Sequence, residues 1–105
     1  MNILDNVPQI NTGNEYFDTL MQSATIKVER IFSNGVRNGQ WYDQEEDGWV
    51  ILLHGEAELD FGTHCQPLCQ GDYILIPAHQ KHRVTKTSSD AIWLAIHFSA
   101  LLKQS

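Results

Sequence analysis

The stretch GDYILIPAHQKH, residues 71–82, decides the fold class of this chain. It opens with Gly71-Asp72, a pair typical of tight turns, and continues into the apolar run Tyr73–Ile76, which is short enough for a buried strand. Pro77 cannot donate a hydrogen bond to a sheet ladder, so it marks the end of that strand. The pattern therefore predicts a turn, a short strand and a second turn that returns the chain near His82.

Segments of similar length and composition lie on both sides of this stretch. They are Thr25–Phe32, Trp49–Leu53, Glu56–Phe61, Lys81–Lys86 and Ala91–Phe98. Turn residues separate them, for example Ser33-Asn34-Gly35 and His54-Gly55. About seven or eight short strands at roughly ten-residue spacing predict an all-β sandwich or barrel.

Alternation within two of the segments predicts which face is buried. Ile26, Val28 and Phe32 share one face of their segment, and Lys27 and Glu29 share the other. We therefore expect a half-buried strand with the apolar face inward. The segment Glu56–Phe61 alternates as well, and we expect its apolar residues Ala57, Leu59 and Phe61 to point inward.

The N-terminal region has a different pattern. Residues 1–13 are polar with two breakers, and we expect a loose or docking arm. Asn14 is a suitable cap for a short helix with Phe17, Leu20 and Met21 on one face. The expected organisation is an arm with a possible short helix over residues 1–24, one β-barrel over 25–99 and a tail over 100–105.

Composition restricts the class of partner and the compartment. The 105 residues suffice for one domain, and a net charge of −6 argues against nucleic acid. No apolar run is long enough to span a bilayer and no secretory signal is evident, so a cytoplasmic protein is expected. Cys65 and Cys69 are then reduced thiols, the alternatives being a disulfide or a zinc site with His64.

Residues 71–82 resemble the second sequence motif of the cupin superfamily. In that family a Gly opens a strand, a Pro follows after five intervening residues, and a His lies five residues beyond the Pro. Gly71, Pro77 and His82 match this spacing. Two common family positions differ, because His79 replaces a Gly and Lys86 replaces an Asn. The resemblance implies a cupin (jelly-roll) β-barrel with His82 aimed at its lumen.

The first cupin motif is matched less well. Its closing Gly corresponds to Gly55, and counting back from there places Gly48 where the family has a Glu. The two His positions of the motif fall on Tyr42 and Gln44, or on Trp41 and Asp43, depending on the spacer. The resemblance implies a metal held by three His and one Glu, and of these only His82 is present.

Replacement ligands for a divalent metal (Zn, Fe, Mn or Ni) are available in the chain. The candidate metal-binding residues are His82, His79, His97, Asp43 and Glu46. The candidate pocket residues are Trp41, Tyr42 and Gln44. Trp41 and Tyr42 are suited to line a pocket, to pack beneath the barrel or to form a dimer contact.

Two functions follow from these residues. In the first, a divalent metal acts as a Lewis acid on a small polar metabolite in the lumen. In the alternative, a metal-free barrel binds or senses a small molecule without catalysis. An interaction protein using Trp41 and Tyr42 is a weaker third reading. The resemblance also implies a homodimer, in which Met1–Gly13 could pair across the interface, and an exposed sheet edge favours such pairing.

Overall fold

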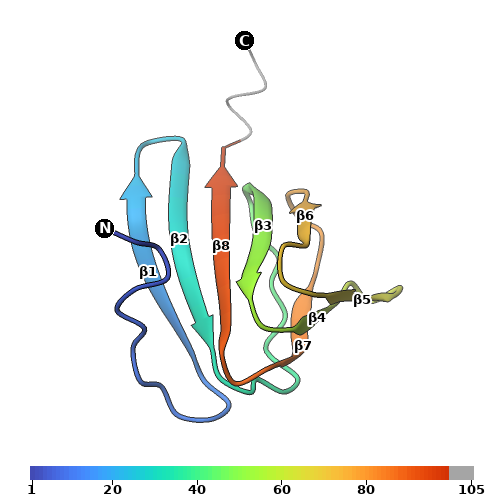
Figure 1. Cartoon of the computed structure of the whole chain (residues 1–105). Coiled ribbons are helices and arrows are strands. Elements are labelled where there is room, and N and C mark those ends of the chain that lie inside the picture. The colour runs from blue at the N-terminus through green and yellow to red at the C-terminus, as the bar shows by residue number, and fades with distance from the viewer. Residues whose placement is uncertain (100–105) are drawn as a thin grey trace.

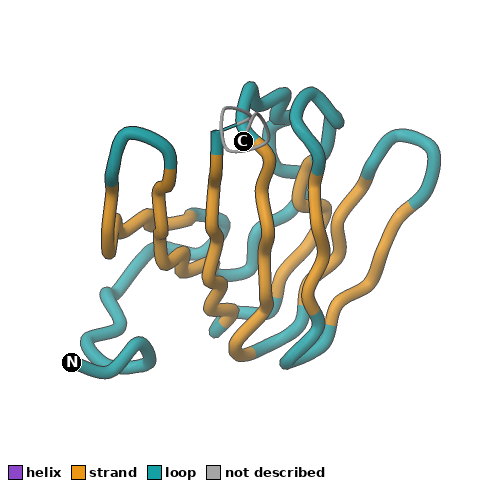
Figure 2. Tube along the Cα trace, turned by 90° about the horizontal axis from the view of Figure 1, so that it is seen from above, coloured by secondary structure: helices purple, strands orange, loops and turns teal. Residues whose placement is uncertain are grey.

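A computed structural model describes residues 1–99, and within them all regular structure is strand (Figures 1 and 2). The strands are β1 (Glu15–Gln22), β2 (Ile26–Ser33), β3 (Asp47–His54), β4 (Ala57–Asp60), β5 (Cys65–Leu68), β6 (Tyr73–Ile76), β7 (Arg83–Thr87) and β8 (Ala91–Phe98). They form a five-stranded antiparallel sheet in the order β1-β2-β8-β3-β6 and a three-stranded sheet in the order β5-β4-β7. The predicted all-β, jelly-roll class is confirmed.

Turn chemistry explains several strand boundaries. The hairpin between β3 and β4 turns at Gly55, where φ is +90°, a conformation that favours glycine. A Cβ at Gly55 would lie 2.5 Å from the Ser88 hydroxyl and 2.9 Å from the Ala91 Cα, so a side chain is excluded there. Pro77 follows the last residue of β6, as the sequence predicted.

The predicted helix after Asn14 is wrong, because these residues form strand β1. β1 pairs antiparallel with β2, and its register shifts between Thr19 and Met21, which makes Leu20 an extra, bulged residue. The bulge interrupts the two-residue alternation, so the apolar spacing resembles that of a helix. The side chains of Phe17, Leu20 and Met21 remain about half exposed and form no buried helical face.

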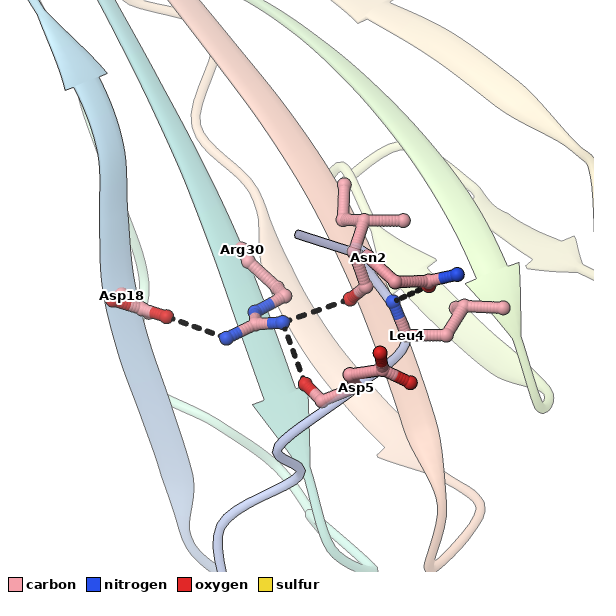
Figure 3. Close-up of polar contacts among 6 residues, drawn as sticks. Asn2, Leu4, Asp5, Asp18 and Arg30 are labelled. Atoms are coloured by element: carbon pink, nitrogen blue, oxygen red, sulfur yellow. Dashed lines mark hydrogen bonds and ion pairs between the residues drawn. The ribbon is translucent and has the colours of Figure 1, made fainter.

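The N-terminal arm, residues 1–13, lies against the outer face of the five-stranded sheet. One amino group of the Arg30 guanidinium donates to the carbonyls of Ile3 and Asp5, at 2.9 Å each (Figure 3). Its other amino group donates to the Asp18 carboxylate at 2.7 Å. Residues 7–11 lie beside Phe32 and Ile92, which are buried. Arg30 thus ties the arm to the chain's own sheet. The predicted tail, residues 100–105, lies outside the described residues.

The inner faces of the two sheets enclose the core. Leu52, Leu59 and Trp93 are buried there, and the expected inward direction of Ala57, Leu59 and Phe61 agrees with their burial. The prediction for β2 is reversed, because Lys27 and Glu29 face inward with Ile31, while Val28 and Phe32 face outward. The reason is that the outer face of β2 is also covered in part, by the arm.

Two expectations about the compartment can be compared with the described residues. Among residues 1–99 there is no helix with the length and apolar character needed to cross a membrane. Cys65 and Cys69 are both free and exposed. The described residues therefore contain no disulfide between these two thiols.

Candidate ligand site in the barrel lumen

A cavity with an open mouth lies between the two sheets. Its apolar wall consists of Phe17, Ile31, Val50, Leu59, Ile76, Val84, Trp93 and Ala95. Its polar groups belong to Glu15, Glu29, Tyr42, Gln44, His82 and His97, and Gly48 completes the lining. A largely apolar cavity with a few placed polar groups is the usual form of a small-molecule site.

His82 lies at the end of the returning turn, immediately before β7, and is 9% exposed. Its backbone pairs with that of Tyr42 through two hydrogen bonds of 2.8 and 3.1 Å, and the two rings are 5.7 Å apart. Its Nδ1 lies 3.0 Å from the Gln80 carbonyl oxygen. Because a carbonyl only accepts, neutral His82 carries its proton on Nδ1 and has a lone pair on Nε2. His82 is thus a hydrogen-bond acceptor in the lumen.

The structure also decides between the two alignments of the first motif. Tyr42, Gln44 and Gly48 line the cavity together with His82. Trp41 and Asp43 do not, and Trp41 is 47% exposed, with the Arg83 guanidinium 4.8 Å from its ring centroid. The positions at which the family pattern has its metal ligands are therefore Tyr42, Gln44, Gly48 and His82.

This donor set does not fit a cupin metal. Gly48 supplies no ligand, the Gln44 amide is a weak one, and His82 is the only imidazole among the four. Across residues 1–99, no group of three or more His, Cys, Asp or Glu side chains is arranged to hold a metal ion.

The predicted replacement ligands are dispersed. His79 and Asp43 pair with each other at 2.9 Å on the surface, with their side chains 66% and 48% exposed. Glu46 is exposed and lies in a second hollow at the barrel mouth. His82 and His97 alone among the five line the lumen. The metal set expected from the sequence is therefore not assembled.

His79, which stands where the cupin pattern often has Gly, has a left-handed backbone conformation. Its φ is +64°, in the left-handed region that glycine adopts without strain. Its backbone N–H donates to the Gln44 carbonyl at 2.7 Å, which ties the turn after β6 to the loop before β3. The Gly-to-His difference from the family pattern thus leaves the turn intact.

Sequence reasoning missed Glu29, which is hydrogen-bonded to His97 inside the lumen. The His97 Nε2 lies 2.9 Å from Glu29 Oε1, and the Lys27 ammonium lies 3.6 Å from Glu29 Oε2. The hydrogen bond from His97 lowers the pKa of the Glu29 carboxyl, and the nearby Lys27 charge acts in the same direction. A His on a strand as apolar as Ala91–Phe98 was the available signal that an acidic partner faces it.

A second polar chain extends along the lumen wall from Trp93 to Glu15. The Trp93 indole N–H donates to the Ser33 hydroxyl at 3.1 Å, and that hydroxyl donates to the Glu15 carboxylate at 2.6 Å. Burial raises the pKa of Glu15, although the hydrogen bond from Ser33 opposes the shift. Glu15 and Ser33, like Glu29, were not among the predicted site residues.

Comparison with solved structures identifies the family. A protein of Ralstonia eutropha described as a "putative mannose-6-phosphate isomerase" is 35% identical, with a TM-score of 0.86 over 95% of this chain and 97% of that one. An RmlC-like cupin of Shewanella frigidimarina is 16% identical, with a TM-score of 0.74 over 95% and 88% of the two chains. KdgF of a Halomonas species is 14% identical, with a TM-score of 0.75 over 100% and 97%. The chain belongs to the cupin superfamily.

No protein-family model matches the sequence, and no curated protein matches it.

Proposed function

We propose that this cupin binds a small, neutral and largely apolar molecule in its lumen without a resident metal. The observation that carries the proposal is the lining at the four motif positions, where Tyr42, Gln44, Gly48 and His82 provide hydrogen bonds and space in place of a ligand set. His82 Nε2 would accept a hydrogen bond from a ligand hydroxyl or amide. The apolar strands around it would contact the rest of the molecule.

The charges around the cavity favour a neutral ligand. No Arg or Lys is found among the described residues that line the lumen, and two of its polar side chains are carboxylates. Lys27 lies at the mouth and is paired with Glu29, while Arg83 lies outside the lumen and pairs with Asp60 at 3.3 Å. A phosphate group would enter this lumen without a cationic partner. The ligand class therefore differs from the sugar phosphate in the name of the Ralstonia relative.

The first experiment is metal analysis of the untagged protein beside a His82→Ala variant. We expect substoichiometric metal in both, also after incubation with Fe, Mn, Ni and Zn salts. Stoichiometric metal in the wild type that is lost in His82→Ala would overturn the metal-free proposal and favour the metal-dependent enzyme predicted as the first alternative.

The second experiment tests the lumen by thermal shift with a panel of neutral aromatic alcohols, using mannose 6-phosphate as the anionic comparison. We expect stabilisation by members of the neutral panel and none by the phosphate. Gly48→Leu should abolish the shift, because a Cβ at position 48 would already lie 3.7 Å from the His97 ring. His54→Ala, on an exposed hairpin residue, is the matched control. Ligand shifts that persist in Gly48→Leu would place binding elsewhere.

We also propose that the chain forms a homodimer through the outer face of its five-stranded sheet. Trp49, Ile51, Tyr73 and Leu75 lie side by side on β3 and β6, and Tyr73 and Leu75 are 66% and 56% exposed. The arm covers the other side of this face, over Phe32 and Ile92. A flat apolar patch of this kind suits a second copy related by a two-fold axis.

Sedimentation velocity tests the homodimer. Leu75→Glu should shift the chain to monomer, because a charge would have to be buried at the centre of the contact. Leu20→Glu, at a leucine that is 46% exposed on the opposite edge strand, should leave the dimer intact. Equal behaviour of the two variants would reject this face as the interface.

A further inference from the structure

The lumen contains a hydrogen-bonded pair of side chains, Glu29 and His97, that has no part in the ligand-binding proposal. Glu29 on β2 and His97 on β8 are joined by a 2.9 Å hydrogen bond, and their side chains are only 10% and 14% exposed. Residues 27 and 97 are register neighbours, and residue 97 pairs with Gly48 on β3. The pair therefore sits on the inner face of the five-stranded sheet, at the end where β2 and β3 begin and β8 ends.

The partner of His97 determines which of its nitrogens is basic. An ionised carboxylate only accepts hydrogen bonds, and the lowered pKa of Glu29 keeps it ionised near neutral pH, so Nε2 carries the proton of a neutral His97. Nδ1 then carries the lone pair. Among residues 1–99, Nδ1 has no hydrogen-bond partner in the structure.

Gly48 lies next to this lone pair and has no side chain to cover it. A Cβ at position 48 would lie 3.7 Å from His97 Nδ1, in ordinary van der Waals contact. Both residues line the lumen cavity, so the nitrogen adjoins the volume that a ligand would fill. The position at which the cupin pattern has a metal-binding Glu is here a Gly beside an imidazole nitrogen.

A ligand would meet the pair on its way into the lumen. Glu29, Gln44 and His97 line both the lumen cavity and the outer hollow at the barrel mouth. The outer hollow is formed by the β1–β2 turn, residues 22–27, and by the loop before β3. His97 thus stands at the junction between the mouth and the interior.

We propose that His97 is a general base for metal-independent proton transfer from a carbon atom of the lumen ligand, and that Glu29 is its positioning residue. In the step, the Nδ1 lone pair takes the proton, the C–H bond breaks, and its electron pair remains on the ligand as an enolate or expels a leaving group. The resulting imidazolium is stabilised by the Glu29 carboxylate. The substrate class is a neutral carbon acid, such as a carbonyl compound with an acidic α-hydrogen. The inference rests on the proposed lumen binding.

Two other His–carboxylate pairs in the described residues provide a comparison. His54–Asp90, at 3.0 Å, has side chains 49% and 61% exposed, and His79–Asp43 is similarly exposed. Both lie in water, where an imidazole gains little as a base over free buffer. His97–Glu29 differs by lying in a mostly apolar cavity, where a base is desolvated and held against its substrate.

Other titratable groups around the pair also influence the pH dependence. They are Lys27 on β2, Glu45 and Glu46 in the loop before β3, Glu15 on β1 and His82 before β7. Lys27 is the nearest cation to Glu29, at 3.6 Å. A test must therefore separate Glu29 from these groups by substitution rather than by pH alone.

The experiment measures the elimination of 5-nitrobenzisoxazole, a small, neutral and largely apolar carbon acid. A base removes its ring C–H proton, the N–O bond breaks, and a coloured cyanophenolate forms, so no co-reactant is needed. Binding is followed separately by two-dimensional NMR of the lumen residues. We expect binding and turnover by the wild type, with a pH–rate profile governed by a single base.

Three variants assign the base. His97→Gln should lower kcat/KM by about 100-fold or more, the usual contribution of a general base. Glu29→Gln should lower kcat with little change in KM, because the imidazolium loses its anionic partner while the lumen that binds the probe keeps its apolar wall. His54→Gln, on the exposed pair, should leave both binding and turnover unchanged. His97→Asn, which also lacks a basic ring nitrogen, replaces His97→Gln if that variant does not fold.

The outcomes separate the two proposals. Binding in the lumen without turnover, or turnover that survives His97→Gln or its replacement His97→Asn, overturns the general base and leaves ligand binding intact. Failure of this neutral probe to enter the lumen counts against the proposed function, and the proton-transfer inference falls with it.

Discussion

The inner and outer faces of the five-stranded sheet differ in a way that neither hydropathy nor burial alone would indicate. The outer face has the more continuous apolar surface, with rows such as Val28, Ile96, Trp49 and Leu75 across four strands. The inner face, which encloses the lumen, carries Glu15, Glu29 and His97 among its apolar residues. Glu15, Glu29 and His97 are thus paired polar residues inside an apolar barrel, while an exposed apolar row lies outside it.

The two faces of the sheet therefore place different requirements on their side chains. A side chain on the inner face must be apolar or have a partner, as Glu29 has His97 and Glu15 has Ser33. On the outer face, the arm covers Phe32 and Ile92, and Tyr73 and Leu75 remain exposed. The inner face therefore holds the core and the proposed ligand site, and the outer face holds the proposed dimer contact.

The largest expected effect compares one substitution on the two faces. Leu52→Ala on the inner face should lower the free energy of unfolding by about 2–5 kcal/mol, because Leu52 is fully buried and a cavity would remain. Leu75→Ala on the outer face, 56% exposed, should change it by less than about 0.5 kcal/mol in the monomer.

Urea denaturation at low protein concentration measures both values. Raising the concentration should increase the cost of Leu75→Ala alone, because only the outer face takes part in the proposed dimer. Similar losses for the two variants at low concentration would contradict the division between the faces.

An intermediate effect concerns the two lumen carboxylates and pH. The pKa of Glu29 is lowered in the fold, so its stabilisation is present above about pH 4.3, the ordinary value for Glu, and is lost as the pH falls through the lowered value. The pKa of Glu15 is raised, so its contribution has the opposite sign and is lost as the pH rises through the raised value.

Denaturation midpoints of Glu29→Gln and Glu15→Gln across the acid range test these signs. Glu29→Gln should lose part of the acid-induced destabilisation of the wild type. In the wild type, ionisation of the buried Glu15 lowers the free energy of unfolding as the pH rises toward neutral, and Glu15→Gln should lack this loss. Parallel pH curves for the two variants would show that the carboxylates do not differ in this way.

The smallest expected effect is at the turn before His82. His79→Gly would relieve the left-handed backbone conformation at φ +64° but would give the unfolded chain more freedom. It would also remove the exposed contact with Asp43, which is worth little. The net change in the free energy of unfolding should stay within about 1 kcal/mol, measured by thermal denaturation. A larger loss would mean that the His79 side chain supports the lumen wall.

The sequence predicted the fold well because its signals are local. Gly71-Asp72 and Pro77 delimit β6, and the alternation of Glu56–Phe61 indicates β4 and its inward face. The helix prediction failed because a bulge at Leu20 gives a strand an apolar spacing close to that of a helix.

The site was harder to predict than the fold because it depends on pairing across the sheet. Glu29 and His97 are 68 residues apart in the chain, so the His on an apolar strand signals an acidic partner but its sequence neighbours do not identify Glu29 as that partner. The inward face of β2 was reversed for the same reason, since the arm that covers its apolar face comes from a distant segment. The resemblance placed His82 in the lumen, and only the register of β3 and β8 placed Gly48 against His97.

The position of β8 has a consequence for how the chain folds during its synthesis. β8 is the last strand within residues 1–99 and the central strand of the five-stranded sheet, between β2 and β3 (Figure 1). On a ribosome, the β1–β2 hairpin and the strands from β3 to β7 would therefore emerge as two parts without their shared neighbour. The barrel closes only when Phe98 is available, so a nascent chain paused before this point would expose two apolar strand edges to chaperones and to other nascent chains.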